Sequence, residues 1–406
     1  MKLCRACFAG GSNGGLDKMP IKNRFAEMHE EITSWRRDIH EHPEILFETH
    51  RTSALVESKL KEFGCDEVVS GIGHTGVVAV IKGGKSTSGR VVGLRADMDA
   101  LPINEETGLE HASKTPGAMH ACGHDGHTAM LLGAAKYLAE TRNFNGTAVV
   151  IFQPAEEGGA GGKVMCDDGM MERFGIQEVY GLHNWPGMPA GMFGIRKGAF
   201  FAAADQFEIV VEGLGGHAAK PQDTVDPTVI SAHLVAALQT IVSRNADPVE
   251  QTVVSVTSME TSSVTYNVIP TSVLLKGTVR TLSPKIRDLA EKRMRELCDN
   301  LCAAFGGKAR LTYERGYPVM SNHDEQTDFA AEVARSVGGQ CEDAPLVMGG
   351  EDFAYMLEER PGAYILMGNG DTAMVHNTKY DFNDDAIPSG CSWWVGLIEQ
   401  RMPAHN

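Results

Sequence analysis

Residues 119–130, MHACGHDGHTAM, place histidine, cysteine and aspartate side chains within a few positions of one another. Thiolates and neutral imidazoles suit Zn²⁺, and carboxylate oxygens also accept Mn²⁺. Cys122 and His124 are two positions apart, which would place them on different faces of a helix. A loop that contains Gly123 can direct both toward one point. By itself, the cluster also fits the first turn of a helix with histidines at the surface. Together with the side chains at the strand ends described next, it predicts a metal site.

Further metal-competent side chains lie at the ends of short apolar runs typical of buried strands. The runs span residues 90–97, 146–153, 178–184 and 362–369. In open α/β sheets the ligand site lies outside the carboxyl ends of the strands, so these groups should converge on one edge. They are Asp97, Asp99, Glu156, Glu157, His183 and His376.

These strands alternate with helical patterns such as residues 128–140, which predicts an α/β fold with a largely parallel sheet. Residues 205–315 differ, because their pattern reads strand, helix, strand, strand, helix, strand, the ferredoxin-like βαββαβ unit. We therefore expect a catalytic domain formed by 21–204 and 316–406, with a small domain inserted at 205–315. Residues 1–20 are expected to be a flexible leader, with Met19 as a candidate start.

Composition excludes several classes of protein. The 406 residues carry a formal net charge of −16, which argues against nucleic acid and anionic membranes as partners. No apolar run approaches the ~20 residues of a membrane span, and no secretory signal is present. The 9 cysteines lack the spacing of a disulfide framework, which suits a reducing compartment, so a cytoplasmic protein is expected.

The candidate ligands suffice for two divalent metal ions. If the cysteine bridges, each ion receives three protein ligands and keeps an open position, as catalytic sites do. Of the adjacent Glu156 and Glu157, one can bind metal while the other acts as the general base, although an EE pair can also be a solvated acidic pair. The residue types do not distinguish Zn from Mn. The candidate ligands are Cys122, His124, Glu157, His183 and His376.

Nine short motifs together resemble the metallopeptidase superfamily of the zinc aminoacylases and glutamate carboxypeptidases. More narrowly, they resemble its N-acyl amino acid amidohydrolases, hippurate hydrolases and auxin-conjugate hydrolases, from about residue 25 to 400. The motifs are LRADMDALP, MHACGHDGHTAM, QPAEEGGAGG, GLHNWP, GGHAAKP, YNVIP, GTVR, MGGEDF and HNTKYDFND.

The resemblance implies a binuclear centre built by the five ligands above, with Glu156 as general base. It also implies that the inserted domain is a lid that dimerises, and that His217 reaches the partner's active site to stabilise the oxyanion. Asn267 and Arg280 would bind the substrate carboxylate, for which the arginine fork is suited. Homo-oligomers, either dimers or dimers of dimers, are expected.

The chain departs from many superfamily members, which carry histidine in place of Asp97 and aspartate in place of Cys122. Asp97 and Asp99 are therefore expected to orient an imidazole rather than to bind metal. Without metal, Cys122 is expected to have a low pKa and to be the most reactive thiol.

The expected function is an amidohydrolase that uses metal-activated water to cleave small-molecule N-acyl amino acids into a carboxylic acid and a free amino acid. A dipeptidase or carboxypeptidase of the same superfamily is the alternative. A nicotinamide-dependent oxidoreductase is disfavoured, because GIGHTG at 71–76 precedes a strand pattern rather than a helix. A serine hydrolase lacks its GxSxG motif, and a binding protein without catalysis should lack a ligand or the base.

Other chemically able residues are assigned structural roles. Trp393 and Trp394 are expected to anchor a terminal helix, and Cys298 and Cys302 to be buried thiols. The remaining histidines outside strand ends are expected to be surface imidazoles: His40, His42, His50, His111 and His323.

Overall fold

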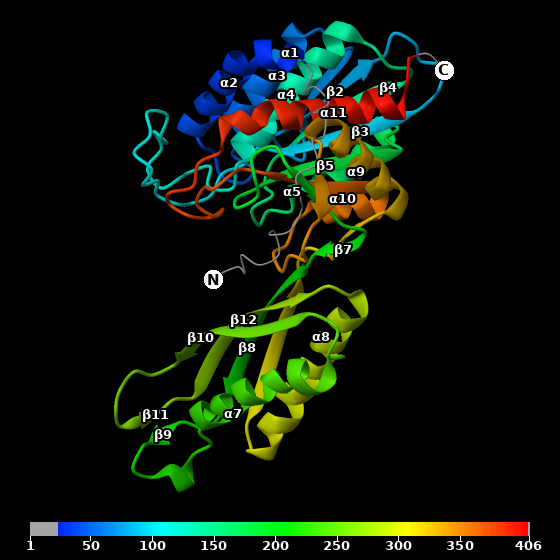
Figure 1. The fold of residues 1–406 in the computed structure, drawn as a ribbon. Coiled ribbons are helices and arrows are strands. Elements are labelled where there is room, and N and C mark those ends of the chain that lie inside the picture. Colours follow the sequence, from blue (N-terminus) through cyan, green and yellow to red (C-terminus); the bar gives the residue numbers. More distant parts are fainter. Residues whose placement is uncertain (1–22, 405–406) are drawn as a thin grey trace, which may run out of the picture.

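A computed structural model describes residues 23–404, which form two lobes joined at a narrow waist (Figure 1). We call residues 23–201 together with 320–404 the large lobe, and residues 203–315 the small lobe. The expected leader, residues 1–20, lies outside the described residues. Among the described helices, none combines the length and apolar composition needed to cross a membrane.

The large lobe contains an eight-stranded sheet in the order β1-β2-β4-β3-β5-β16-β6-β15. The four central strands β4, β3, β5 and β16 are parallel, whereas β1 and β2 are antiparallel and β6 is antiparallel to β16. The sheet is therefore mixed, and the expectation of a mostly parallel sheet holds for its centre and for the edge pair β6–β15. The strands are β1 Glu67–Ile72, β2 Gly76–Lys82, β3 Val91–Asp97, β4 Thr147–Gln153, β5 Glu178–Trp185, β6 Phe193–Ile195, β15 Cys341–Asp343 and β16 Gly362–Gly368.

One tight turn explains the antiparallel edge. Residues 73–75, within the GIGHTG sequence at 71–76, join β1 directly to β2, and a short hairpin can only join antiparallel strands. Because a strand follows this GxGxxG sequence, no helix N-terminus is available for a pyrophosphate. The dinucleotide-binding alternative is wrong.

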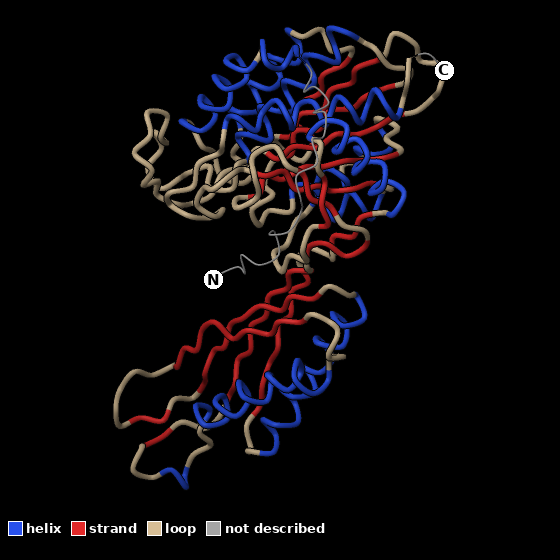
Figure 2. The backbone as a smooth tube through the Cα atoms, in the orientation of Figure 1, coloured by secondary structure: helices blue, strands red, loops and turns tan. Residues whose placement is uncertain are grey.

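The small lobe is built on a four-stranded sheet in the order β10-β12-β8-β13, with every neighbouring pair antiparallel. Helices α7 and α8 cover one face and leave the other face open (Figure 2). The elements are β8 Ala203–Glu212, β9 Gly216–His217, a 3₁₀ turn Pro221–Asp223, α7 Pro227–Thr240, a π-helical turn Ile241–Asn245, β10 Thr252–Thr261, β11 Val268–Ile269, β12 Ser272–Thr281, α8 Pro284–Ala304 and β13 Lys308–Arg315.

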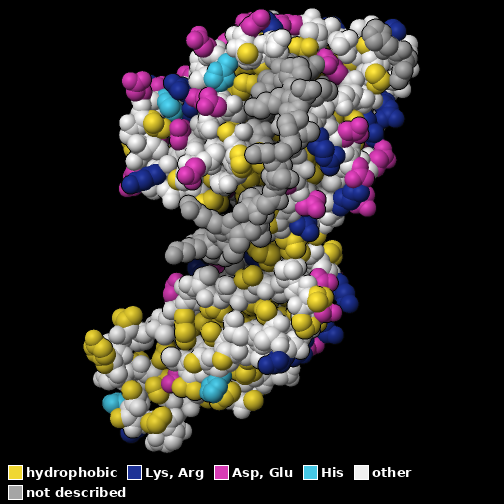
Figure 3. Space-filling view, in the orientation of Figure 1, with side chains coloured by type: hydrophobic (Ala, Val, Ile, Leu, Met, Phe, Trp, Pro, Cys, Tyr) yellow, Lys and Arg dark blue, Asp and Glu magenta, His cyan; other side chains and the backbone are white. Residues whose placement is uncertain are grey.

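Local sequence explains these elements. Pro227 and Pro284 begin α7 and α8 at the first helical position, where a missing N–H is tolerated. Alternate residues of β8 are buried, so one side of the strand faces the helices. Cys298 and Cys302 are buried in this core, as expected. Hydrophobic side chains also gather on the visible outer face of the small lobe (Figure 3).

Helices cover both faces of the large sheet. Residues Val77 and Ala79 of β2 pack into one core and Val78 into the other, as the two-residue period of a strand requires. The first face packs against α1 Asn23–Glu27, α2 His29–Glu41, α3 His50–Glu62, α4 His124–Thr141, α9 Asp324–Gly338 and α11 Ile387–Arg401; the second packs against α5 Gly161–Asp167, α6 Met170–Arg173 and α10 Phe353–Glu359.

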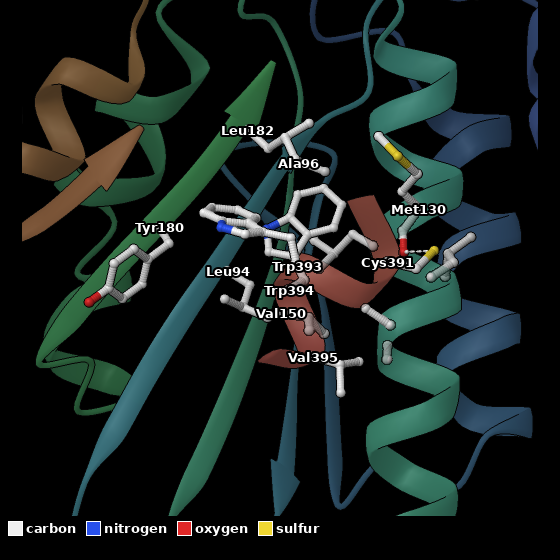
Figure 4. Packing of buried hydrophobic residues seen from close by; sticks show 14 of the residues in the cluster. Leu94, Ala96, Met130, Val150, Tyr180, Leu182, Cys391, Trp393, Trp394 and Val395 are labelled. Atoms are coloured by element: carbon white, nitrogen blue, oxygen red, sulfur yellow. Dashed lines mark hydrogen bonds between the residues drawn. The ribbon is translucent and has the colours of Figure 1, made fainter. Parts of the chain in front are cut away.

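The two tryptophans of α11 lie in the first core, beside Leu94 and Val150 (Figure 4). Both are fully buried, and the Trp393 indole donates a hydrogen bond of 3.2 Å to the Ala330 carbonyl. This confirms that Trp393 and Trp394 anchor the terminal helix. Truncation of either to alanine should cost about 3–5 kcal/mol of unfolding free energy.

The waist is formed where the chain passes between the lobes in both directions. Strand β7 Gly198–Phe201 precedes β8, and strand β14 Met320–Asn322 follows β13. These two short strands pair antiparallel where the large lobe adjoins the small lobe. The connections at residue 202 and at 316–319 therefore lie close to each other.

Candidate metal centre and active site

The central parallel strands bring the candidate ligands to one edge of the sheet. Strand β4 leads into Glu156 and Glu157, His183 lies near the end of β5, and the loop after β16 leads to His376. Because β4, β3, β5 and β16 are parallel neighbours, their carboxyl ends meet. The structure therefore places these side chains together, as the sequence pattern predicted.

Cys122 and His124 reach the same point through a turn at Gly123. The φ of Gly123 is +90°, a left-handed conformation that favours glycine. A Cβ atom there would lie 2.3 Å from the Asn184 side-chain nitrogen and 2.4 Å from the Tyr380 hydroxyl. Position 123 therefore excludes larger residues, and His124 begins α4 immediately after it.

Two buried histidines direct their Nε2 atoms to this point. His124 Nδ1 donates to the Asp99 carbonyl at 2.8 Å, and His124 Nε2 is buried without a hydrogen-bond partner. His183 Nδ1 donates to the Asn184 carbonyl at 2.6 Å, and His183 Nε2 lies 3.3 Å from Cys122 Sγ. A carbonyl bound to Nδ1 fixes the tautomer in which Nε2 can bind a metal.

A second pair completes the cluster on its more exposed side. Glu157 Oε1 lies 3.1 Å from His376 Nε2. His376 has a φ of +63° and donates its backbone N–H to the Ala121 carbonyl at 2.7 Å, which holds this unusual conformation. The loop after β16 is thus fastened to the loop that carries Cys122.

The ligand atoms form two groups that share one sulfur. Cys122, His124 and His183 form one group, and Cys122, Glu157 and His376 the other, each with its ligand atoms within 4.8 Å of one another. Two divalent cations bridged by the thiolate would each receive three protein ligands. The residues present therefore fit a pair of metal ions.

The charge balance of the region also fits cations. The buried Arg95 guanidinium already pairs with Asp97 at 2.7 Å, Asp352 at 2.9 Å and Glu351 at 3.1 Å. This single cation is shared among several buried carboxylates, and Glu156 lies beside Glu351 and Asp352. Buried carboxylates without compensating charge are costly, so metal cations would stabilise the cluster.

Glu156 and Glu157 diverge from an irregular turn. Residues Ala155, Gly158 and Ala160 all have positive φ, which for the two alanines costs roughly 1–2 kcal/mol each. The Asp99 carboxylate accepts the backbone N–H groups of Glu156 at 3.0 Å and Glu157 at 3.1 Å. Both carboxylates lie near His124, and Glu157 also lies near Cys122 and His376.

The two glutamates have opposite pKa shifts. Burial, together with Glu351 and Glu157, raises the pKa of Glu156 well above its usual value. Burial also raises the pKa of Glu157, but the His376 hydrogen bond and the charge of His124 outweigh it and lower the pKa. Adjacent carboxyl groups with different proton affinities can serve as proton carrier and as ligand.

The expectation of a low pKa for Cys122 is wrong for the metal-free protein. Burial, followed by the charges of Glu157 and Glu156, raises the pKa of this thiol well above its usual value. A buried thiolate beside carboxylates is disfavoured unless a cation is present. The sequence pattern showed the neighbouring histidines but not the burial.

Asp97 and Asp99 contact the cluster from outside the ligand set. Asp97 Oδ1 accepts from His127 Nδ1 at 2.6 Å, and His127 Nε2 accepts from the Asn184 backbone N–H at 2.9 Å. Asp97 therefore orients an imidazole, although it is that of His127. Asp99 holds His124 through its carbonyl and the Glu156 turn through its carboxylate.

A cavity of about 670 Å³ opens beside the cluster at the waist. Its size matches that of small-molecule sites. The small lobe contributes the partly buried Arg280, which faces the large-lobe ligands across this space. Other lining residues include Glu156, Trp185, Phe201, Gln206, Glu314, Tyr317 and Val347.

Two expected site residues lie elsewhere. His217 ends β9 and Asn267 precedes β11, at the end of the small lobe farthest from the large lobe (Figure 1). Both are exposed and neither lines the cavity. Within one chain, the structure brings Arg280 to the cavity but not His217 or Asn267.

Two histidines expected at the surface are buried. His40 Nδ1 lies 2.8 Å from Asp125 and His40 Nε2 lies 3.3 Å from Glu105, and His111 is buried nearby. The carboxylates explain how a histidine is tolerated there, and only tertiary contacts bring them together. The other three differ in exposure: His42 is half-buried, and His50 and His323 are exposed.

Several residues of the site were not predicted from the sequence. Glu351 belongs to the quoted motif MGGEDF, so its acidic pair was a usable signal. Arg95 lies inside a strand pattern, where an uncompensated charge signals a buried ion pair. Tyr317, whose hydroxyl contacts the Glu156 turn, gave no local signal.

Comparisons with known proteins agree with this geometry. The model of peptidase family M20/M25/M40 matches residues 93–400. A hippurate hydrolase of Campylobacter jejuni is 42% identical over 91% of this chain and 96% of its own length. A thermostable carboxypeptidase of Saccharolobus solfataricus is 39% identical over 91% and 95%.

A solved structure supports the same relationship. A Bacillus subtilis protein described as a dinuclear metal-binding peptidase of family M20 has a TM-score of 0.82 and 33% identity, covering 93% of this chain and 99% of its own. This likeness extends over both lobes. The chain therefore belongs to peptidase family M20/M25/M40 and is a metal-dependent amidohydrolase.

Proposed function

We propose that this enzyme hydrolyses N-acyl amino acids to a carboxylic acid and a free amino acid. The observation that carries the proposal is the pair of ligand groups that share Cys122, beside Glu156 and a cavity that also contains Arg280. Two ions, Zn or Mn, would be held by Cys122, His124, Glu157, His183 and His376.

Bound divalent ions supply Lewis acidity toward an amide carbonyl and a water molecule. Glu156 is the general base: its carboxylate takes a proton from water and later delivers it to the leaving nitrogen. Its burial and its position near His124 and Glu157 support this role. The Asp99 carboxylate holds the turn that carries Glu156 through its backbone N–H.

Arg280 binds the carboxylate of the amino acid portion. The negative charge of Asp205 interacts electrostatically with Arg280. The Asp205 carboxylate, however, forms its salt bridge with Arg287. The Arg280 guanidinium therefore remains available to make two parallel hydrogen bonds to a substrate carboxylate. Asn267 cannot reach the cavity of its own chain, so it would bind the substrate carboxylate in the cavity of a partner subunit.

The inserted domain predicted at residues 205–315, which lies within the small lobe, serves as a ferredoxin-like lid and dimerisation domain. Its strand β10 lies at an open sheet edge, which is a surface suited to pairing with a second copy. Val264 and Tyr266, on the loop after β10, are almost fully exposed. In such a dimer or dimer of dimers, His217 would stabilise the oxyanion in the partner's site.

A dipeptidase or carboxypeptidase activity is the second candidate, favoured by the identity with the Saccharolobus solfataricus carboxypeptidase. Both kinds of substrate carry a carboxylate for Arg280 and an amide for hydrolysis. They differ at the acyl side, where a dipeptide has a free ammonium group. A matched panel of hippurate, N-acetyl amino acids and dipeptides separates them.

The test compares Glu156→Gln with the exposed control Glu48→Gln, each reconstituted with Zn²⁺ or Mn²⁺. We expect E156Q to retain its metal and lose about 10²–10⁴-fold in kcat, while E48Q resembles the wild type. Full activity of E156Q would contradict the role of the base. Absence of turnover on every N-acyl amino acid by reconstituted wild type would contradict the function.

A further inference from the structure

Tyr317 connects the small lobe to the turn that carries Glu156 and Glu157. It lies between β13 and β14, in the connection that returns from the small lobe. Its hydroxyl donates to the Glu156 carbonyl and accepts the N–H groups of Gly158 at 2.9 Å and Ala160 at 3.3 Å. One side chain thus satisfies three backbone groups of the turn.

The turn requires such support. The left-handed conformations of Ala155 and Ala160 are unfavourable and persist only where surrounding contacts impose them. Asp99 holds the N-terminal part of the turn through the amides of Glu156 and Glu157. Tyr317 holds the C-terminal part, so the two residues together fix the directions of both glutamates.

The position of Tyr317 depends in turn on the junction between the lobes. Its carbonyl accepts the Ala204 N–H at 3.0 Å. The preceding Gly316 donates its N–H to Asp205 at 3.2 Å, and its carbonyl accepts from Arg287 at 3.0 Å. The Tyr317 ring also packs edge-on against Tyr355. Anchors from both lobes therefore determine where the hydroxyl lies.

We propose that Tyr317 is a positioning residue that sets the geometry of the Glu156 turn from the base of the small lobe. The inference rests on the proposed roles of Glu156 as base and Glu157 as ligand. Its hydroxyl is engaged by backbone groups, so its loss should disturb metal binding and the chemical step more than substrate binding. It also couples the placement of the small lobe to the metal centre.

The experiment compares Tyr317→Phe with Tyr355→Phe in the full-length enzyme. Tyr355 is the matched control, because its hydroxyl donates to the Gly316 carbonyl at the same junction without touching the turn. Zn²⁺ titration of metal-free protein and the separate values of kcat and KM are measured. For Y317F we expect about 10–100-fold weaker binding of one ion and a similar loss of kcat, with KM nearly unchanged.

Gly158→Ala disturbs the same turn without altering the junction. Gly158 has a φ of +99° and nothing lies near an added Cβ, so the variant changes the backbone preference alone. We expect G158A to reproduce the Y317F pattern in metal affinity and kcat. This variant decides the question if Y317F fails to fold, and wild-type behaviour of G158A would overturn the inference.

Two further outcomes overturn the inference: wild-type metal affinity and kcat in Y317F, or an equal loss in Y355F, which would point to a general effect of the junction. Failure of the proposed function can be distinguished from failure of this inference about Tyr317. It appears as missing turnover in the wild type, whereas the Zn²⁺ titration still measures whether Tyr317 positions Glu157.

Discussion

The two lobes present their chemistry in different ways. In the large lobe, Cys122, His124 and His183 are buried, and backbone carbonyls orient the two histidines. In the small lobe, His217 and Asn267 are exposed and lie far from the cavity of their own chain. The large lobe alone therefore holds all five candidate ligands, whereas the small lobe brings only Arg280 of its three expected site residues to the cavity of its own chain.

The architectures explain this difference. Ligand positions must be accurate to about 0.5 Å, and buried parallel strands covered by helices provide that rigidity. The small lobe is an antiparallel sheet with one face uncovered and with β10 and β13 as its edge strands. Such a sheet supplies a surface for pairing rather than a buried site.

The strongest test of the large lobe's role is His183→Ala. Loss of a ligand from the more buried group should empty one site and reduce kcat by about a thousandfold or more, since each ion contributes several kcal/mol. Metal analysis and kcat measure this effect. His50→Ala, at an exposed position, is the control. If H183A still bound two ions, the claim that the large lobe forms the metal centre through His183 would be contradicted.

His40→Ala tests burial outside the ligand set. Removing this imidazole takes one partner from each of the buried carboxylates of Asp125 and Glu105 and leaves Asp125 with Arg36 alone, which should cost about 3–5 kcal/mol of unfolding free energy. Denaturant unfolding measures the loss, and His50→Ala should change stability by less than about 0.5 kcal/mol. A loss as small as that of H50A would contradict the buried pairing.

The effect of His40 should also depend on pH. Burial lowers the pKa of His40, but Asp125 and Glu105 outweigh burial and raise the pKa to about 9 from the ordinary 6.5. A raised folded pKa stabilises the protein fully below about 6.5, and this stabilisation is lost as pH rises through about 9. The stability difference between wild type and H40A should therefore shrink across that interval.

His217→Ala tests whether the small lobe acts on a partner. We expect kcat to fall about 10²–10³-fold, as for removal of one oxyanion donor, with metal content unchanged. H217A mixed with E156Q should regain activity, because about a quarter of all sites then combine an intact base with an intact partner histidine in random dimers. No recovery after subunit exchange would show that His217 does not act across an interface.

The smallest expected effect belongs to Arg280→Lys. Lysine keeps the charge but loses the bidentate fork, so KM should rise about tenfold while kcat changes little. A substrate analogue with a carboxamide in place of the carboxylate supplies the control, because it should not distinguish the variant from the wild type. Equal KM values on the natural carboxylate would contradict the assigned contact.

Much of the large lobe could be predicted because its signals are local. Apolar runs marked the strands that form its centre, and Gly123 between Cys122 and His124 marked a loop. The length of an apolar run does not predict the direction of its strand. The antiparallel pairing of β1 and β2 is decided by the tight turn between them. In the small lobe, the order of strands and helices along the chain could be predicted from the sequence pattern. The position of a partner subunit could not, because no local pattern encodes it.

The sequence by itself determined which side chains can bind metal, where strands deliver them, and to which family the chain belongs. These follow from residue chemistry and from periods of a few residues. Tertiary structure alone decided that His40 is buried, that the pKa of Cys122 is raised, and that Tyr317 reaches Glu156 from 161 positions away. Burial, charge neighbours and long-range contacts arise only when distant segments pack, so no local pattern encodes them.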